Sequence, residues 1–175
     1  CGGTCAADNN NNGICDELEI EGCTNPQALN FESESNVDDG SCLTAGDLPE
    51  GWNVSPTPAS AVFLGNVTVD NEPLTETAVI GAFSELGMCV GYATLVTVDG
   101  TDFVSLTLYG DDATTEEIDG MLAGQSFSLS LFLSSTDTTL AYRENGIIAA
   151  LPGWSNTNGT PMTDYSDAEV TYNFS

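Results

Sequence analysis

The chain has 175 residues, with 27 acidic side chains, one basic side chain (Arg143) and neither lysine nor histidine, so its formal net charge is -26. A surface this acidic repels nucleic acid and anionic lipid, and neither is an expected partner. The absence of histidine and lysine excludes Ser-His-Asp and Cys-His sites and Schiff-base chemistry. A glycosidase needs only two carboxylates, but a small sandwich without cleft-forming insertions disfavours one, so we expect no enzymatic activity, no catalytic residue and no organic cofactor.

Composition divides the chain into three parts. Residues 1–45 are polar and rich in Asn, Asp and Cys, and they predict a loop-rich head held by metal and disulfide bonds, because so small a segment cannot bury enough apolar surface to fold on its own. Prolines at 49, 56 and 58 indicate a linker over residues 46–59. Residues 60–175 carry the apolar pattern of the main domain.

Residues 8–19 match the twelve-residue calcium loop of EF-hands. Oxygen-bearing side chains occupy loop positions 1, 3, 5 and 9, glycine occupies position 6, where the chain must turn sharply, and glutamate occupies position 12. The spacing predicts a calcium site; the alternative is a solvated turn rich in Asn and Asp. The expected ligands are the side chains of Asp8, Asn10, Asn12, Asp16 and Glu19 and the carbonyl of Ile14.

The cysteines indicate disulfide bonds and an oxidising, extracellular setting, since their spacing lacks the pairs typical of zinc sites. Pairing within the head cannot satisfy all the head cysteines, because their number is odd. Either Cys89 pairs with a head cysteine, or two thiols stay free, or a bridge joins two chains. We favour a bridge from the head to Cys89, within one chain or to a neighbour. The six are Cys1, Cys5, Cys15, Cys23, Cys42 and Cys89.

Residues 22–31 (GCTNPQALNF) and 37–42 (VDDGSC) form a second motif. It resembles the GCTDPxAxNYxPxAxxDDGSC module of large secreted surface proteins of Bacteroidota and marine bacteria, and it departs from that module at Asn25, Phe31 and Ser33. The preceding residues 1–8 (CGGTCAAD) are similar to thrombospondin type 3 calcium repeats.

This resemblance implies a Cys23–Cys42 disulfide around a loop rich in oxygen ligands. It also implies a second calcium site, for which the candidates are Asn30, Asn36, Asp38 and Asp39. The alternative is that Asp38, Asp39 and Gly40 form a tight turn inside a disulfide loop, because such turns favour Asp and Gly.

Period-two alternation of apolar residues predicts strands beyond the linker. Acidic residues after a threonine predict one short helix at residues 114–122. About seven strands at this spacing predict a mainly β fold, an antiparallel β-sandwich behind the head. The expected strands cover residues 61–70, 77–83, 88–98, 102–109, 126–133, 138–143 and 170–174.

The strand domain, through residues 78–83, 87–93 and 108–112, also resembles a β-domain that follows such modules in the same secreted proteins. We therefore expect a non-catalytic, calcium-stabilised, secreted or cell-surface structural protein, a self-associating subunit or repeat of a bacterial filament or layer. The alternative is a carbohydrate-binding or adhesin module with a glycan partner. No stretch approaches the ~20 apolar residues that span a bilayer, so membrane insertion is not expected.

Overall fold

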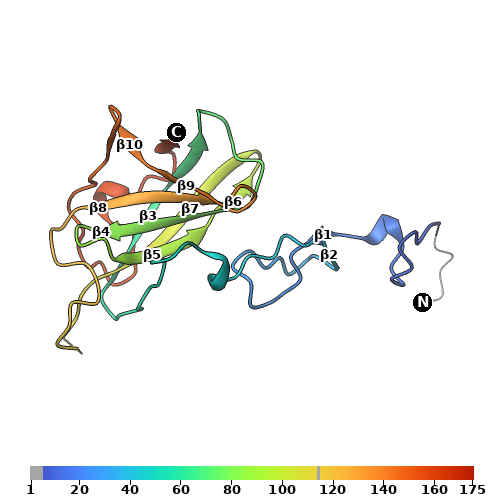
Figure 1. Cartoon of the computed structure of the whole chain (residues 1–175), viewed down its shortest axis with the longest axis horizontal. Helices are drawn as coiled ribbons and strands as arrows, with labels where there is room; N and C mark the ends of the chain where they lie inside the picture. The colour runs from blue at the N-terminus through green and yellow to red at the C-terminus, as the bar shows by residue number, and fades with distance from the viewer. Residues whose placement is uncertain (1–5, 114) are drawn as a thin grey trace. The chain divides into compact units, whose positions relative to one another are not determined.

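The computed structural model describes residues 6–113 and 115–175 (Figure 1). The chain divides into two compact units, Cys1–Asp47 and Leu48–Ser175. The sequence predicted a linker over residues 46–59, but from Leu48 onward this segment belongs to the second unit. Trp52 is buried there, with 6% of its surface exposed, so the segment is attached to the sandwich by an aromatic anchor.

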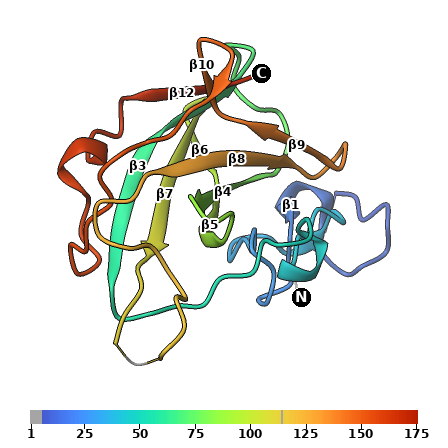
Figure 2. The same ribbon diagram turned by 60° about the vertical axis from the view of Figure 1, so that its left-hand side comes forward.

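Two four-stranded sheets form the second unit, and the predicted mainly β fold is confirmed (Figure 2). One sheet has the order β12-β3-β7-β6 and the other the order β5-β4-β8-β9. Neighbouring strands in both sheets are antiparallel, except that β12 runs parallel to β3. The strands are β3 (Ser60–Val69), β4 (Ala78–Ser84), β5 (Cys89–Thr94), β6 (Val96–Val98), β7 (Thr101–Tyr109), β8 (Phe127–Leu133), β9 (Thr138–Ala141), β10 (Arg143–Glu144), β11 (Ile147–Ile148) and β12 (Thr171–Phe174).

Alternating apolar side chains fill the space between the two sheets. Ala61 and Phe63 of β3 and Leu106 of β7 are fully buried from one sheet, and Leu129 and Leu131 of β8 are fully buried from the other. All five belong to one hydrophobic cluster. Burial of each large apolar side chain contributes roughly 1.5–3 kcal/mol, so the alternation seen in the sequence is what holds the sheets together.

A second hydrophobic group lies on the outer face of the β5-β4-β8-β9 sheet. Trp52 packs edge-on against Phe83 of β4 and Phe132 of β8, with ring centroids 5.4 and 6.3 Å apart. Gly81 of β4 lies beneath the indole, where a Cβ would come within 2.7 Å of the ring. The segment before β3 therefore covers an apolar patch that the sheet alone would expose to water.

The predicted short helix at residues 114–122 is wrong: apart from Thr114, which lies outside the described residues, the segment forms turns and an isolated bridge. The N–H of Met121 donates to the carbonyl of Tyr109 (3.0 Å), and the N–H of Asp111 donates to the carbonyl of Met121 (2.9 Å). Pairing with the end of β7 thus overrides local helix propensity. Among the described residues, no helix has the length and apolar character needed to cross a membrane.

The first unit has little apolar core. Within its described part, two hydrophobic side chains are buried, Cys23 and Leu43. Cross-links between loops must therefore hold this unit together, as in other small scaffolds. Its elements are the 3-10 turns η1 (Asp16–Leu18) and η2 (Ala45–Asp47) and the parallel pair β1 (Glu21–Gly22) and β2 (Val37–Asp38); a third turn, η3 (Thr163–Tyr165), lies in the second unit.

Candidate calcium site

The loop predicted to bind calcium, residues 8–19, turns back on itself at its middle. Gly13 has a φ of +87° and Asn11 a φ of +58°, a left-handed conformation that glycine and asparagine adopt at low cost. The N–H of Asp16 then donates to the carbonyl of Ala7 at 3.0 Å. The two halves of the loop are therefore held side by side, as the glycine at position 6 predicted.

Asp8 organises the first half of this loop. Its Oδ1 accepts the N–H of Asn12 and its Oδ2 accepts the N–H of Gly13, each at 3.1 Å. Both carboxylate oxygens therefore face the interior of the turn. A carboxylate at loop position 1 is thus fixed where the later ligands must converge.

Glu19 closes the second half of the loop. Its Oε1 accepts the Nδ2 amide groups of Asn10 (2.9 Å) and Asn12 (2.8 Å). Since Asn12 is also bound to Asp8 through its backbone and accepts the N–H of Ile14, five of the six predicted ligands belong to one hydrogen-bonded network. The spacing in the sequence is therefore matched by proximity in the folded loop.

Asp16 is the predicted ligand outside this network. The Asp16 carboxylate accepts the backbone N–H and the side-chain amide of Asn9, at 2.9 and 2.6 Å. The N–H of Ile14 donates to Asn12 Oδ1 at 2.8 Å. Asn9 was given no role from the sequence, because it occupies a loop position that is not a ligand.

The donor set fits a hard cation such as calcium, which takes six to eight oxygens at adaptable distances. Within residues 6–113 and 115–175, no group of three or more Asp, Glu, Cys or His side chains is arranged to hold a metal. A calcium ion in this loop would therefore need amide oxygens as well as carboxylates. Binding would require Asn10 and Asn12 to turn their carbonyl oxygens toward the ion, in place of the amide nitrogens that now contact Glu19.

The two asparagines of the predicted second site act as clamps between loops. Asn36 Oδ1 accepts the N–H of Ile20 and its Nδ2 donates to the carbonyl of Leu18, both at 2.9 Å. Asn30 likewise accepts the N–H of Leu43 (2.7 Å) and donates to the carbonyl of Ser41 (2.8 Å). Each side-chain amide thus satisfies a backbone N–H and a backbone carbonyl that strand pairing would satisfy in a sheet.

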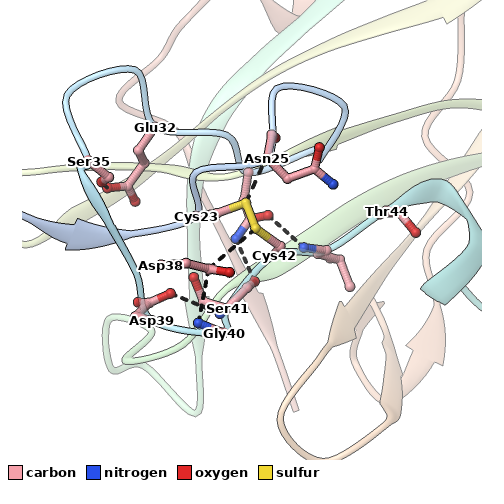
Figure 3. The surroundings of a disulfide bond; sticks show 12 residues. Cys23, Asn25, Glu32, Ser35, Asp38, Asp39, Gly40, Ser41, Cys42 and Thr44 are labelled. Atoms are coloured by element: carbon pink, nitrogen blue, oxygen red, sulfur yellow. Dashed lines mark hydrogen bonds between the residues drawn. A yellow bond between two sulfur atoms is a disulfide. The ribbon is translucent and has the colours of Figure 1, made fainter. Parts of the chain in front are cut away.

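Asp38 and Asp39 take part in a turn beside the disulfide (Figure 3). Asp38 Oδ1 accepts the N–H of Gly40 (3.1 Å), and Asp39 Oδ1 accepts the N–H of Ser41 (2.8 Å). Hydrogen bonds from the Ser41 side chain and backbone hold the pKa of Asp39 below its ordinary value. The tight-turn alternative accounts for these contacts without a metal, and the second calcium site stays a prediction.

Cys23 and Cys42 form the disulfide that the resemblance implied, across a sequence separation of 19. A closed loop of about this length contributes roughly 3 kcal/mol in the chain-entropy model. Cys15 is also disulfide-bonded, while Cys1 and Cys5 lie outside the described residues. The expected bridge from the head to Cys89 is wrong for a single chain, because Cys89 is a free, buried thiol at the start of β5.

Burial predicts that Cys89 is unreactive in the folded protein. Its side chain is 4% exposed, and desolvation raises the pKa of the thiol from 9.0 to about 11. The neutral thiol is therefore favoured by folding, so its contribution to stability is present below pH 9 and is lost as the pH rises toward 11. Maleimide labelling of Cys89 at pH 8, located by peptide mapping, should be slow in buffer and fast in urea. Rapid labelling of Cys89 in the native protein would contradict this burial.

A pocket of about 300 Å³ lies over strands β5 and β7 of the second unit. Its polar lining consists of hydroxyl groups, and none of the lining side chains carries a charge, which contrasts with the acidity of the chain as a whole. The lining residues are Val54, Pro56, Tyr92, Ala93, Ser105, Thr107 and Tyr109. Exposed aromatic rings suit sugar stacking, but Trp52, Trp154 and Phe132 are buried.

No family model, no curated protein and no solved structure matches the chain. The motif at residues 22–42 therefore remains a resemblance that rests on its residues alone. What the loop at residues 8–19 does must be argued from its chemistry.

Proposed function

We propose that this protein is a non-catalytic structural subunit or repeat of an extracellular bacterial assembly, a surface filament or layer, whose first unit is ordered by calcium. The observation that carries the proposal is the hydrogen-bonded network of Asp8, Asn10, Asn12 and Glu19, which gathers predicted calcium ligands in one loop. The Cys23–Cys42 disulfide supports a secreted or cell-surface location, because such bonds persist in oxidising surroundings.

The charge of the chain supports a role for divalent cations. A net charge of -26 opposes both compaction and contact between copies. Calcium bound in the loop neutralises two charges at once and adds RT ln(1 + [L]/Kd) to the stability of the first unit. Extracellular calcium modules bind at roughly 10⁻⁴ to 10⁻³ M, so the ion would be bound outside cells and lost where calcium is scarce.

Calorimetric titration with calcium is expected to show binding in this range, and Glu19→Gln should weaken it by about tenfold or more, or roughly 1.4 kcal/mol. The reason is that Glu19 occupies the position of the bidentate ligand. Glu17→Gln is the matched control, because it removes the same charge from an exposed residue of the same loop that is not a predicted ligand. Equal losses in both variants would show that the loop attracts calcium only through its overall charge.

Negative-stain electron microscopy of the purified chain, in millimolar calcium and then in excess chelator, tests the assembly itself. Ordered polymers that disperse on chelation are the expected result. Monodisperse particles in both conditions would contradict self-association as a property of this chain.

A carbohydrate-binding or adhesin module is the second candidate, and the uncharged pocket over β5 and β7 favours it. Tyr92 and Tyr109 offer aromatic rings, and Ser105 and Thr107 offer hydroxyl groups, a combination that suits a neutral sugar. Retention of the monomeric protein on an immobilised neutral glycan would favour this candidate over the structural one.

A further inference from the structure

The β10–β11 hairpin presents apolar side chains to solvent. Arg143 pairs with Ile148 and Glu144 pairs with Ile147 across it. Asn145 and Gly146 both have positive φ, at 51° and 79°, as the tight type I′ turn requires. Ile147 is 73% exposed and Ile148 is 50% exposed. Directly opposite residues of a hairpin share a face, so the exposed Ile148 lies on the same face as Arg143 and gives it an apolar neighbour to which another protein can bind.

Arg143 gives this hairpin a positive charge, and it is the sole basic side chain of the sequence. In the part of the chain that the structure describes, no carboxylate forms an ion pair with it; its Nη1 donates to the carbonyl of Gly146 at 3.1 Å. The guanidinium therefore retains donors for a carboxylate of another molecule, and arginine binds carboxylates with two parallel hydrogen bonds.

A complementary surface lies in the loop after β7. We call residues 115–122 the acidic loop. Glu116 and Glu117 are exposed in it, and Ile118 and Leu122 beside them are 48% and 38% exposed. This loop therefore combines carboxylates with apolar side chains, which is the composition that a hairpin carrying one arginine and two isoleucines would bind.

The two surfaces lie at opposite ends of the second unit. The acidic loop follows Gly110, whose N–H donates to the carbonyl of Ala59, next to the first residue of β3. The hairpin follows Tyr142, which forms a β-bridge with Phe174. Phe174 in turn pairs with Val69, the last residue of β3, so the hairpin lies at that end of the strand. Figures 1 and 2 show the β10 hairpin at one end and the golden loop that follows β7 at the other. One copy can therefore offer the hairpin while its own acidic loop points away.

We propose that the β10–β11 hairpin of one copy binds the acidic loop of a second copy, head to tail. This inference rests on the self-association proposed above and names the surfaces responsible. Because the two surfaces differ, the contact is heterologous, and repetition produces a ring if the rotation closes and an open filament if it does not. Any ion pair between the side chains of two copies must use Arg143, since no other side chain of the chain is basic.

Salt should promote this contact at first. At low salt the net charge of -26 on each copy repels the other over long distances, and at physiological ionic strength this repulsion is screened beyond the Debye length of ~8 Å. The Arg143 contact acts at short range and is screened less. Screening therefore removes more repulsion than attraction.

Sedimentation velocity of charge variants tests the contact. Arg143→Glu and the double variant Glu116→Lys/Glu117→Lys should each weaken self-association by roughly tenfold or more. Mixed together they should assemble again, because the intact acidic loop of the first variant can bind the intact hairpin of the second, and the two charge-reversed surfaces attract each other as well. Ile148→Asn, which leaves every charge in place and changes the isoleucine on the same face as Arg143, should weaken association as well. Leu86→Ser is the matched control, since Leu86 is 65% exposed outside both surfaces, and it should assemble like the wild type.

The outcomes distinguish failure of this contact from failure of the proposed structural function. Wild-type assembly that survives all the hairpin and loop variants would overturn this contact and leave the proposed structural function standing. A wild type that stays monomeric with and without calcium would overturn both. Circular dichroism of each variant confirms that a loss of assembly does not come from unfolding.

Discussion

Trp52→Ala is expected to lower the free energy of unfolding of the second unit by roughly 3–5 kcal/mol, the cost typical of deleting a buried tryptophan side chain. The indole covers Phe83 and Phe132 and lies directly over Gly81. Alanine would leave this face of the sheet exposed or bordering a cavity. Urea denaturation followed by circular dichroism measures the change, and Leu86→Ala, at an exposed position, is the control. A variant as stable as the wild type would show that the anchor adds nothing to the sandwich.

Gly91→Ala is expected to cost more than ~3 kcal/mol, at or beyond the upper end of overpacking penalties. A Cβ on Gly91 of β5 would overlap the carbonyl oxygen of Thr107 on β7 and contact Leu106 at 3.4 Å. The obstacle is backbone rather than a side chain that can rotate, so the edges of the two sheets would have to separate. Thermal unfolding of the variant measures the loss.

Ser105→Ala is the control for Gly91→Ala, because it changes an exposed residue on β7 and creates no overlap. A Gly91→Ala protein that melts within a few degrees of the control would show that the sheets can move apart at this corner without losing stability.

Strands β3, β7 and β8 were predictable because each carries its own signal, whereas the single strand predicted at residues 88–98 forms β5 and β6, which belong to different sheets. Alternation along β3, β7 and β8 depends on which side chains face the core, and that is visible in a single stretch of sequence. The turn at Asn145 and Gly146 is equally local, because Asn-Gly is a pair that tight hairpin turns favour. The segment around Glu116 misled because its helical features are also local, whereas its backbone partners, Tyr109 and Asp111, lie at and just beyond the end of β7.

The shape of the candidate calcium loop at residues 8–19 could be predicted in part for the same reason, while calcium binding itself stays a prediction. Its ligand spacing lies within twelve residues, and the turn at Gly13 follows from the glycine itself. The clamps of Asn30 and Asn36 could not be foreseen, because they join residues up to 18 positions apart, and no periodic pattern marks such pairs. The burial of Cys89 likewise depends on strand packing rather than on the number of cysteines.

The parallel pairing of β12 with β3 has a consequence for biogenesis. The Thr68 hydroxyl donates to the side chain of Asn173 over a sequence separation of 105, and Phe174 is fully buried. The first strand of the sandwich therefore acquires its outer neighbour only when the last strand is available. Contacts this distant in sequence slow folding, so we expect the sandwich to stay unfolded on the ribosome until residues 171–174 have been made.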